Sequence, residues 1–148
     1  MAESLDVLRG LLAALDARDL DAVRALLHDD VVLTTPNGRR EGIDDVLGWV
    51  IPFQSAFVDI VHSVTVTTEE GGRAVAEMIA RLSHVGTWTA PDGRVIPATG
   101  RRIANPAVDI VDVEAGKVRD WRIYFDELGM IEQLTQPAWS GEIVPVDR

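Results

Sequence analysis

The feature that most constrains the fold of this sequence is a change of residue pattern near position 55. Before that point apolar residues recur at intervals of three and four, as Leu5, Leu8, Leu11, Leu12 and Leu15 do, which predicts an amphipathic helix. After that point β-branched residues dominate, and glycine turns divide them into segments. Helices followed by an antiparallel meander predict an α+β domain with its helices packed on one face of the sheet.

The boundaries of the elements follow from the same patterns. Residues 74–88 contain helix-favouring alanine and methionine, but they follow a Gly-Gly turn and alternate, so we predict a strand. Residues 89–100 hold two prolines and several turn signals, which predict a loop. The remaining predictions are helices within 5–15, 17–30, 42–53 and 127–134, and strands within 31–35, 57–70, 101–114 and 117–126.

Composition excludes several classes of function. The chain of 148 residues fits one domain and has no cysteine, which removes disulfides, thiolate metal sites and cysteine nucleophiles. The net charge of −10 argues against nucleic acid and anionic membranes as partners, because both need a cationic face. The N-terminal segment lacks the basic start of a signal peptide, and no stretch approaches the ~20 apolar residues of a membrane span. We therefore expect a cytoplasmic protein.

Several strings of the sequence, taken in order, resemble the SnoaL-like polyketide cyclases. RLSHVGTW, PATGRR, AVDIV, EAGKV and WRIYFDELGMIEQL are similar to that family's THTG strand, PTGR loop, GID strand, DGKI turn and WDELGLLQQL ending. The resemblance covers nearly the whole chain and implies the nuclear transport factor 2-like fold, a cone-shaped curved antiparallel sheet wrapped by N-terminal helices around a pocket. We expect one such domain over residues 1–136. The apolar tail, residues 137–148, is expected to pack on the domain or on a partner subunit.

The resemblance carries over only part of the cyclase chemistry. In the cyclases a polar residue on the penultimate strand works with an aspartate on the last strand, and these positions correspond to Asp109 and Ile123. Isoleucine cannot move a proton. In the related ketosteroid isomerases the base would fall at Thr35 and the oxyanion-hole tyrosine at Leu11, and neither residue has the required group.

WRIYFD also resembles a strand of the limonene epoxide hydrolases, which use an Asp-Arg-Asp set with a tyrosine and an asparagine. Arg81 matches the arginine of that set. Ser83 and Ile123 stand at the two aspartates, and Leu33 and Thr35 at the tyrosine and asparagine. Two missing acids make epoxide hydrolysis the weakest of the inherited activities.

Three residues are the candidate catalytic groups. Asp109 lies among apolar neighbours, so it is either a structural ion pair or a general base lining a cavity. Arg81 is expected within pairing distance of Asp109, or as a solvated strand arginine. His84 matches the cyclase histidine and is either structural or a stabiliser of an oxyanion. The expected substrate-binding residues are Thr35, Trp49, Phe53, Ser83, Trp88, Trp121, Ile123 and Phe125.

Alternation along the predicted strand 117–126 indicates which side chains face the pocket and which face outward. If Ile123 faces the pocket, then Arg119, Trp121 and Phe125 share its face, and Arg122 and Tyr124 point away. The outward-facing residues predict a homodimer through the outer face of the sheet, since a bare sheet face would expose a large apolar patch.

Three functions remain open. The first is a cofactor-independent cyclase or isomerase acting on a small, hydrophobic, carbonyl-bearing metabolite, and Asp109 and Arg81 favour it. The second is a non-catalytic ligand-binding or dimeric structural module, which Ile123 favours. The third is an epoxide hydrolase. No metal is expected, because His62 and His84 have no third ligand at metal spacing.

Overall fold

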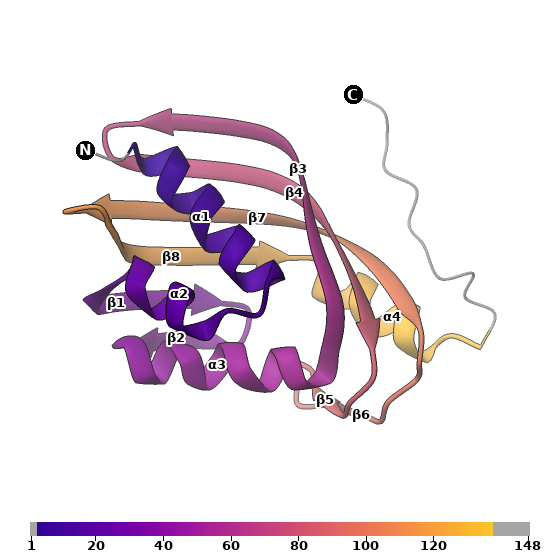
Figure 1. The fold of residues 1–148 in the computed structure, drawn as a ribbon. Coiled ribbons are helices and arrows are strands. Elements are labelled where there is room, and N and C mark those ends of the chain that lie inside the picture. The colour runs from indigo at the N-terminus through magenta and orange to yellow at the C-terminus, as the bar shows by residue number, and fades with distance from the viewer. Residues whose placement is uncertain (1–2, 138–148) are drawn as a thin grey trace.

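The computed structural model describes residues 3–137 and shows a strongly curved sheet with helices against its concave face (Figure 1). Three helices occupy the N-terminal half, and one closes the described chain. The helices are α1 (Ser4–Asp16), α2 (Leu20–Leu26), α3 (Ile43–Ala56) and α4 (Glu127–Thr135). The strands are β1 (Leu27–Thr35), β2 (Gly38–Glu41), β3 (Phe57–Glu70), β4 (Arg73–His84), β5 (Trp88–Thr89), β6 (Val95–Ile96), β7 (Arg102–Glu114) and β8 (Lys117–Phe125).

The sheet has the strand order β2-β1-β8-β7-β4-β3. Strands β3, β4, β7 and β8 form an antiparallel meander, and β1 joins β8 in parallel. The meander turns at Gly71-Gly72 and at Ala115-Gly116, where all four residues have positive φ angles between 52° and 81°. These angles suit the tight turns that match strand twist. The predicted α+β class with a curved sheet is confirmed, and the parallel β1–β8 pair is its one departure from antiparallel pairing.

Two local predictions need correction. Residues 89–100, expected to be a loop, contain the short hairpin in which Trp88 and Thr89 pair with Ile96 and Val95. The expected second helix is shorter than its pattern, because residues 27–30 already belong to β1. The prediction that residues 74–88 form a strand is confirmed over residues 74–84, which belong to β4.

Two hydrophobic clusters stabilise the fold and meet near the middle of the sheet. The first lies under α1 and α3 and includes Leu8, Leu11 and Leu33, all fully buried. The second lies under α4 and the β5–β6 hairpin and includes Phe57 and Met130. Phe125 packs against both clusters. The boundary between two cores is where packing leaves room for a cavity.

The convex face of the sheet carries partly buried apolar side chains among charged ones. Ile79, Val108 and Ile110 point to this face, and Tyr124 is half exposed there. Such a face fits the predicted homodimer, which stays a prediction. The docking of the tail falls outside the described residues, except for Pro137.

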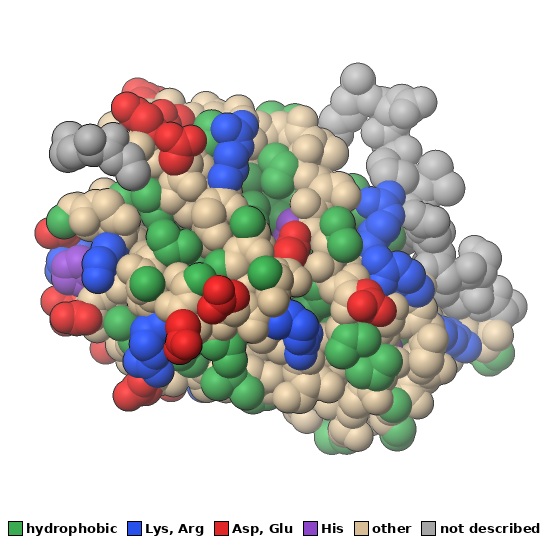
Figure 2. Space-filling view, viewed as in Figure 1, with side chains coloured by type: hydrophobic (Ala, Val, Ile, Leu, Met, Phe, Trp, Pro, Cys, Tyr) green, Lys and Arg blue, Asp and Glu red, His purple; other side chains and the backbone are tan. Residues whose placement is uncertain are grey.

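The surface gives no sign of a cationic binding face on the side seen in Figure 2. Acidic, basic and hydrophobic side chains are interspersed there rather than gathered by sign. Among residues 3–137 no helix is long and apolar enough to cross a membrane.

Candidate active site

A cavity of about 80 Å³ lies between the two hydrophobic clusters, on the concave face of the sheet. Its walls come from α1, α3, β3, β4, β7, β8 and α4, so segments from both ends of the described chain contribute to it. Most of the lining is apolar or aromatic, as expected of a small-molecule site. The lining residues are Leu15, Trp49, Val50, Phe53, Gln54, Ile60, His62, Ala80, Leu82, Asn105, Ala107, Asp109, Trp121, Ile123, Phe125 and Met130.

Asp109 is the carboxylate of this cavity. Alternation along β7 places it on the concave face, and only 4% of it is exposed. Burial raises the pKa of Asp109 from 3.8 to about 6, against the hydrogen bond from Trp121 and the charge of His62, which both lower it. At neutral pH this group is therefore a carboxylate held in an apolar setting, the state that a general base needs.

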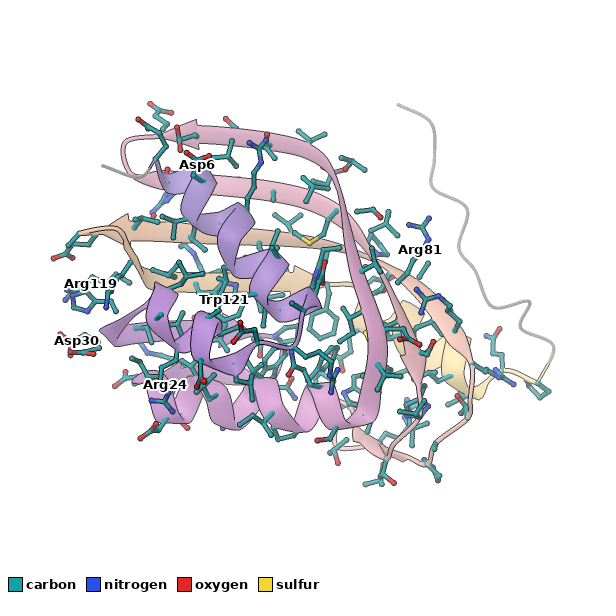
Figure 3. The ribbon with its side chains drawn as sticks, in the orientation of Figure 1. Asp6, Arg24, Asp30, Arg81, Arg119 and Trp121 are labelled. Atoms are coloured by element: carbon teal, nitrogen blue, oxygen red, sulfur yellow. The ribbon has the colours of Figure 1, made fainter. Side chains whose placement is uncertain are left out.

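Trp121 fixes the orientation of that carboxylate. Its indole Nε1 donates to Asp109 Oδ2 at 3.0 Å, and only 1% of the tryptophan is exposed. The indole lies in the interior between the helices and the sheet (Figure 3). No second donor to this carboxylate lies within residues 3–137, so one carboxylate oxygen is oriented and the other is available to the cavity.

Ile123 lies directly opposite Asp109 in the β7–β8 register. The two positions that the cyclase resemblance pairs are thus neighbours on one cavity wall. Phe125 lines the same wall, so three of the four residues predicted to share this face do so.

Arg119, the fourth residue, does not follow the prediction. It is exposed and pairs with Glu114 at 3.1 Å, and Figure 3 shows it at the far end of the sheet from the interior. The cause is an irregularity in the β7–β8 register between Asp112 and Val113, which pairs Val118 with Val113 but Asp120 with Asp112. A bulge of this kind reverses the faces of the residues beyond it.

A second, larger cavity of about 300 Å³ adjoins the first. Trp49, Phe53 and Phe125 line both cavities, and Trp88 lines the larger one. Trp49 and Phe53 stack with their ring centroids 5.3 Å apart. Arg40 brings a cation to this outer cavity. The predicted aromatic substrate-binding residues therefore line two adjoining cavities, and Asp109 lines the smaller one.

Arg81 and Ser83 lie on the other face of β4. Their neighbours Ala80 and Leu82 line the cavity, so alternation sends the arginine and the serine outward. Arg81 Nη1 donates to Ser63 Oγ at 3.4 Å and Ser83 Oγ accepts from Arg102 at 3.0 Å. Figure 3 shows Arg81 away from the interior. The expectation that Arg81 pairs with Asp109 is corrected: Trp121 holds the carboxylate instead.

His84 and Thr35 are buried without lining either cavity. His84 Nδ1 lies 3.0 Å from Thr99 Oγ1, and the ring packs against Phe57 with centroids 5.1 Å apart. Burial lowers the pKa of His84, which favours a neutral ring. Thr35 Oγ1 accepts from the Asn37 amide in the turn after β1. Both side chains are thus engaged in structural contacts.

Three polar groups of the cavity were not among the predicted site residues. Gln54 lines the cavity, and its Nε2 donates to the backbone oxygen of Leu15 at 3.3 Å. His62 lines it and pairs with Asp16, Nδ1 lying 2.5 Å from Asp16 Oδ1. Asn105 also lines it, 3% exposed, and its Oδ1 has no hydrogen-bond partner within residues 3–137. Placing Asn105 on the face of Asp109, four residues away, needed only alternation, but the direction of His62 depends on a bulge that the sequence does not announce.

No cluster of three or more metal-ligating side chains occurs in the described part of the chain. Asp109, His62 and Asn105 supply instead a base, an imidazole and an amide to one apolar space. Such a set can take a proton from carbon and hold the oxygen atoms of a carbonyl compound.

Comparison with known sequences identifies the family of this chain. The SnoaL-like domain model matches residues 8–121. The aklanonic acid methyl ester cyclase DnrD of Streptomyces peucetius is 27% identical over 93% of this chain and 94% of its own length. The aklanonic acid methyl ester cyclase DauD of Streptomyces sp. (strain C5) is 28% identical over 93% of this chain and 84% of its own.

Solved structures share the architecture at lower identity. IdmH of Streptomyces antibioticus, a candidate polyketide cyclase, superposes with a TM-score of 0.77 at 23% identity, over 90% of this chain and 99% of that one. An epoxide hydrolase of the limonene epoxide hydrolase type from M. tuberculosis superposes with a TM-score of 0.69 at 20% identity, over 88% of each chain. At these identities the likeness is one of fold.

Proposed function

This chain belongs to the SnoaL-like domain family, and from that premise we propose that it is a cyclase that closes a ring in a hydrophobic, carbonyl-bearing metabolite. The observation that carries the proposal is Asp109, a buried carboxylate whose pKa of about 6 makes it a base at neutral pH inside an apolar cavity. The names of DnrD and DauD, both methyl ester cyclases, support ring closure as the type of reaction.

The chemistry assigned to Asp109 is abstraction of a proton from carbon. A carbon next to one or two carbonyl groups gives up a proton to a carboxylate when that carboxylate is poorly solvated, and the carbonyl itself takes up the electron pair. The resulting enolate attacks a second carbonyl carbon of the same molecule and closes the ring. Because the carbonyl is the electron sink, the reaction proceeds without a cofactor.

The shape of the site supports a substrate with a reactive end and an extended apolar body. The inner cavity of about 80 Å³ holds only a small group, and the outer cavity of about 300 Å³ has room for more. The aromatic rings of Trp49, Phe53 and Trp88 favour a flat or apolar body there. Asn105 stands where its amide can bind a substrate oxygen in the inner cavity.

A non-catalytic ligand-binding module is the second candidate function. Ile123 favours it, because an isoleucine faces Asp109 where the cyclase resemblance has a second acid. Epoxide hydrolysis is less well supported, since Ile123 and Ser83 stand at the two aspartate positions and Arg81, which matches the arginine, points away from the cavity.

The test compares turnover in matched variants. The protein is incubated with aklanonic acid methyl ester, and conversion to a ring-closed isomer of unchanged mass is followed by chromatography and mass spectrometry. We expect Asp109→Asn to lower the rate by about 10²–10⁴-fold, the usual contribution of a general base. Arg81→Gln, outside the cavity, is the control and should keep the wild-type rate. Wild-type turnover in Asp109→Asn would refute the assignment, and tight binding without turnover would favour the binding module.

A further inference from the structure

His62 faces the cavity because β3 is bulged on either side of it. Val58 pairs with Ser83, and Val61 with Arg81, so β3 advances three residues while β4 advances two. Asp59, within this bulge, has a φ of 52°, a left-handed conformation uncommon for a residue other than glycine. A second register shift lies between Val64 and Val66. Between the two shifts, the side chains around His62 therefore point to the opposite faces from those that strict alternation along β3 would give.

The first bulge reverses the direction of His62. Ser83 lies on the outer face of β4, so its partner Val58 is on the outer face too, and strict alternation would send His62 outward as well. The extra residue instead pairs His62 with Ala80, a lining residue of the cavity. Bulges that re-aim a side chain are frequent next to active sites.

Asp16 binds His62 with both of its oxygens, one at the imidazole and one at the backbone amide. Oδ1 lies 2.5 Å from His62 Nδ1, and Oδ2 accepts the backbone amide of His62 at 3.2 Å. A carboxylate facing Nδ1 keeps the hydrogen on that nitrogen, which leaves Nε2 for the cavity. Asp16 is the last residue of α1, which has no basic residue in its last turn. A carboxylate at a helix C-terminus is disfavoured by the helix dipole, so helix stability does not explain its presence.

His62 and Asp109 approach the same space from the two strands that flank β4. His62 pairs with Ala80, and Asp109 with Ala76, both on the concave face of β4. Ala80 has a small side chain and lines the cavity between them. Asp16 from α1 and Asp109 from β7 are the titratable groups that interact with His62. Asp16 is hydrogen-bonded to His62, and Asp109 lines the cavity together with His62.

We propose that His62, positioned by Asp16, is the proton donor of the ring-closing step, a role that rests on the cyclase function proposed above. Asp109 takes the proton from carbon, and the electron pair left behind forms the new carbon–carbon bond. The π electrons of the attacked carbonyl move onto its oxygen, and that oxygen takes the Nε2 proton of a His62 imidazolium, which leaves a neutral ring with its remaining hydrogen on Nδ1, facing Asp16. One proton thus leaves carbon and one arrives at oxygen, with no leaving group and no change of oxidation state overall. Exchange of protons with solvent then restores Asp109 and His62.

The decisive experiment separates the two proton transfers. Aklanonic acid methyl ester is incubated in deuterium oxide, and mass spectrometry follows both ring closure and deuterium uptake at the acidic carbon of recovered substrate. We expect His62→Gln to lower ring closure by about 100-fold while deuterium uptake persists, because Asp109 still works. Asp109→Asn should abolish both. Asp16→Asn should lower ring closure by about tenfold, as befits a positioning residue.

The outcomes distinguish this inference from the proposed function. Ring closure at the wild-type rate in His62→Gln overturns the role of His62 and leaves the cyclase proposal standing. Ring closure at the wild-type rate in Asp109→Asn removes the cyclase mechanism itself.

A second measurement needs no substrate. Carbon-13 NMR titration of the Asp109 carboxyl reports the charge of its surroundings in the folded protein. The charge of His62 lowers the pKa of Asp109, so His62→Gln should raise it. His28→Gln is the matched control, since His28 lies on β1 outside the cavity and should leave the titration unchanged. An Asp109 pKa that is the same in His62→Gln and in wild type would place the imidazole too far away to act and overturn the inference.

Discussion

Asp109 and His84 are both buried and titratable, but only Asp109 borders a cavity that could hold a ligand. Both side chains lie on the concave face of the sheet, Asp109 4% exposed and His84 not exposed at all. Burial shifts the pKa of each toward its neutral form. Asp109 borders a cavity, whereas His84 is enclosed by Phe57 and the loop at Thr99. A perturbed pKa marks a candidate site only where there is space for a ligand.

The two regions should also respond to pH with opposite sign. Asp109 binds its proton more tightly in the folded state, so its contribution to stability is greatest below pH 4 and is lost as the pH rises to about 6. His84 binds its proton more weakly in the folded state. Its contribution is intact above pH 6.5 and is lost as the pH falls below that value. Variants that remove each group should therefore change the pH dependence of unfolding in opposite directions.

The largest expected effect comes from adding an acid to the cavity wall. Ile123→Asp places a second carboxylate opposite Asp109 and removes an isoleucine whose burial contributes roughly 1.5–3 kcal/mol. Desolvation and the neighbouring charge should raise the pKa of the new acid. We expect a loss of roughly 4 kcal/mol at pH 8, partly recovered at pH 5 as the acid is protonated. Thermal melts across this range measure it.

Ile123→Asn is the control for that variant, because it loses the same apolar contact without adding a titratable group. Its deficit relative to wild type should stay nearly constant between pH 5 and pH 8. An unchanged melting temperature of Ile123→Asp at every pH would show that position 123 is solvated, contrary to its 9% exposure.

The next effect tests whether the His84 region is only structural. His84→Ala removes a fully buried ring that packs against Phe57, and we expect a loss of roughly 3 kcal/mol in the free energy of unfolding. The rate per folded molecule should remain within about threefold of wild type, since the ring does not line the cavity. Denaturant melts and ring-closure assays below the unfolding transition give both numbers. A large loss of rate with unchanged stability would show that His84 takes part in the reaction, contrary to a purely structural role.

Asp109→Asn should have a smaller effect on stability and of the opposite sign. Raising a carboxyl pKa from 3.8 to about 6 costs roughly 3 kcal/mol of stability at pH 7. The amide relieves that cost but leaves its own polar atoms in an apolar cavity, so we expect a gain of roughly 2 kcal/mol. The gain should vanish below pH 4, where wild-type Asp109 is protonated. Urea melts at pH 4 and pH 7 test this, and destabilisation at pH 7 would contradict the buried charge.

Alternation and turn chemistry were enough to predict the α+β class, and the resemblance to the SnoaL-like cyclases added the curved sheet and one wall of the site. Asp109 was expected on a concave strand face, and Trp121, Ile123 and Phe125 share the cavity with it. The glycine turns defined the hairpins correctly. These predictions hold because a period of two is preserved wherever a strand is regular.

The same reasoning failed where a strand is irregular or has two apolar faces. Bulges near Asp59 and Arg119 reverse the faces of the residues that follow, and no glycine announces either of them. On β4 both faces carry apolar residues, so the pattern alone did not show that Arg81 points outward and Ala80 inward. The pairing of Asp16 with His62 joins α1 to β3 and could not be seen without the tertiary structure.

The smallest expected effect tests how the Asp109 carboxylate is held. Trp121→Phe keeps a large ring in place but removes the Nε1–H that donates to Oδ2. This bond lowers the pKa of Asp109, so its loss should raise that pKa by about one unit, or roughly 1.4 kcal/mol. Ring closure should then fall about fivefold at pH 6, where the deprotonated fraction of Asp109 drops from about a half to about a tenth, and recover toward pH 8, because the base is deprotonated there. Trp88→Phe, in the outer cavity, is the control and should leave the acid limb of the pH–rate profile in place. An acid limb that stays at its wild-type pH in Trp121→Phe would mean that desolvation alone sets the basicity of Asp109, and that the indole only fills space.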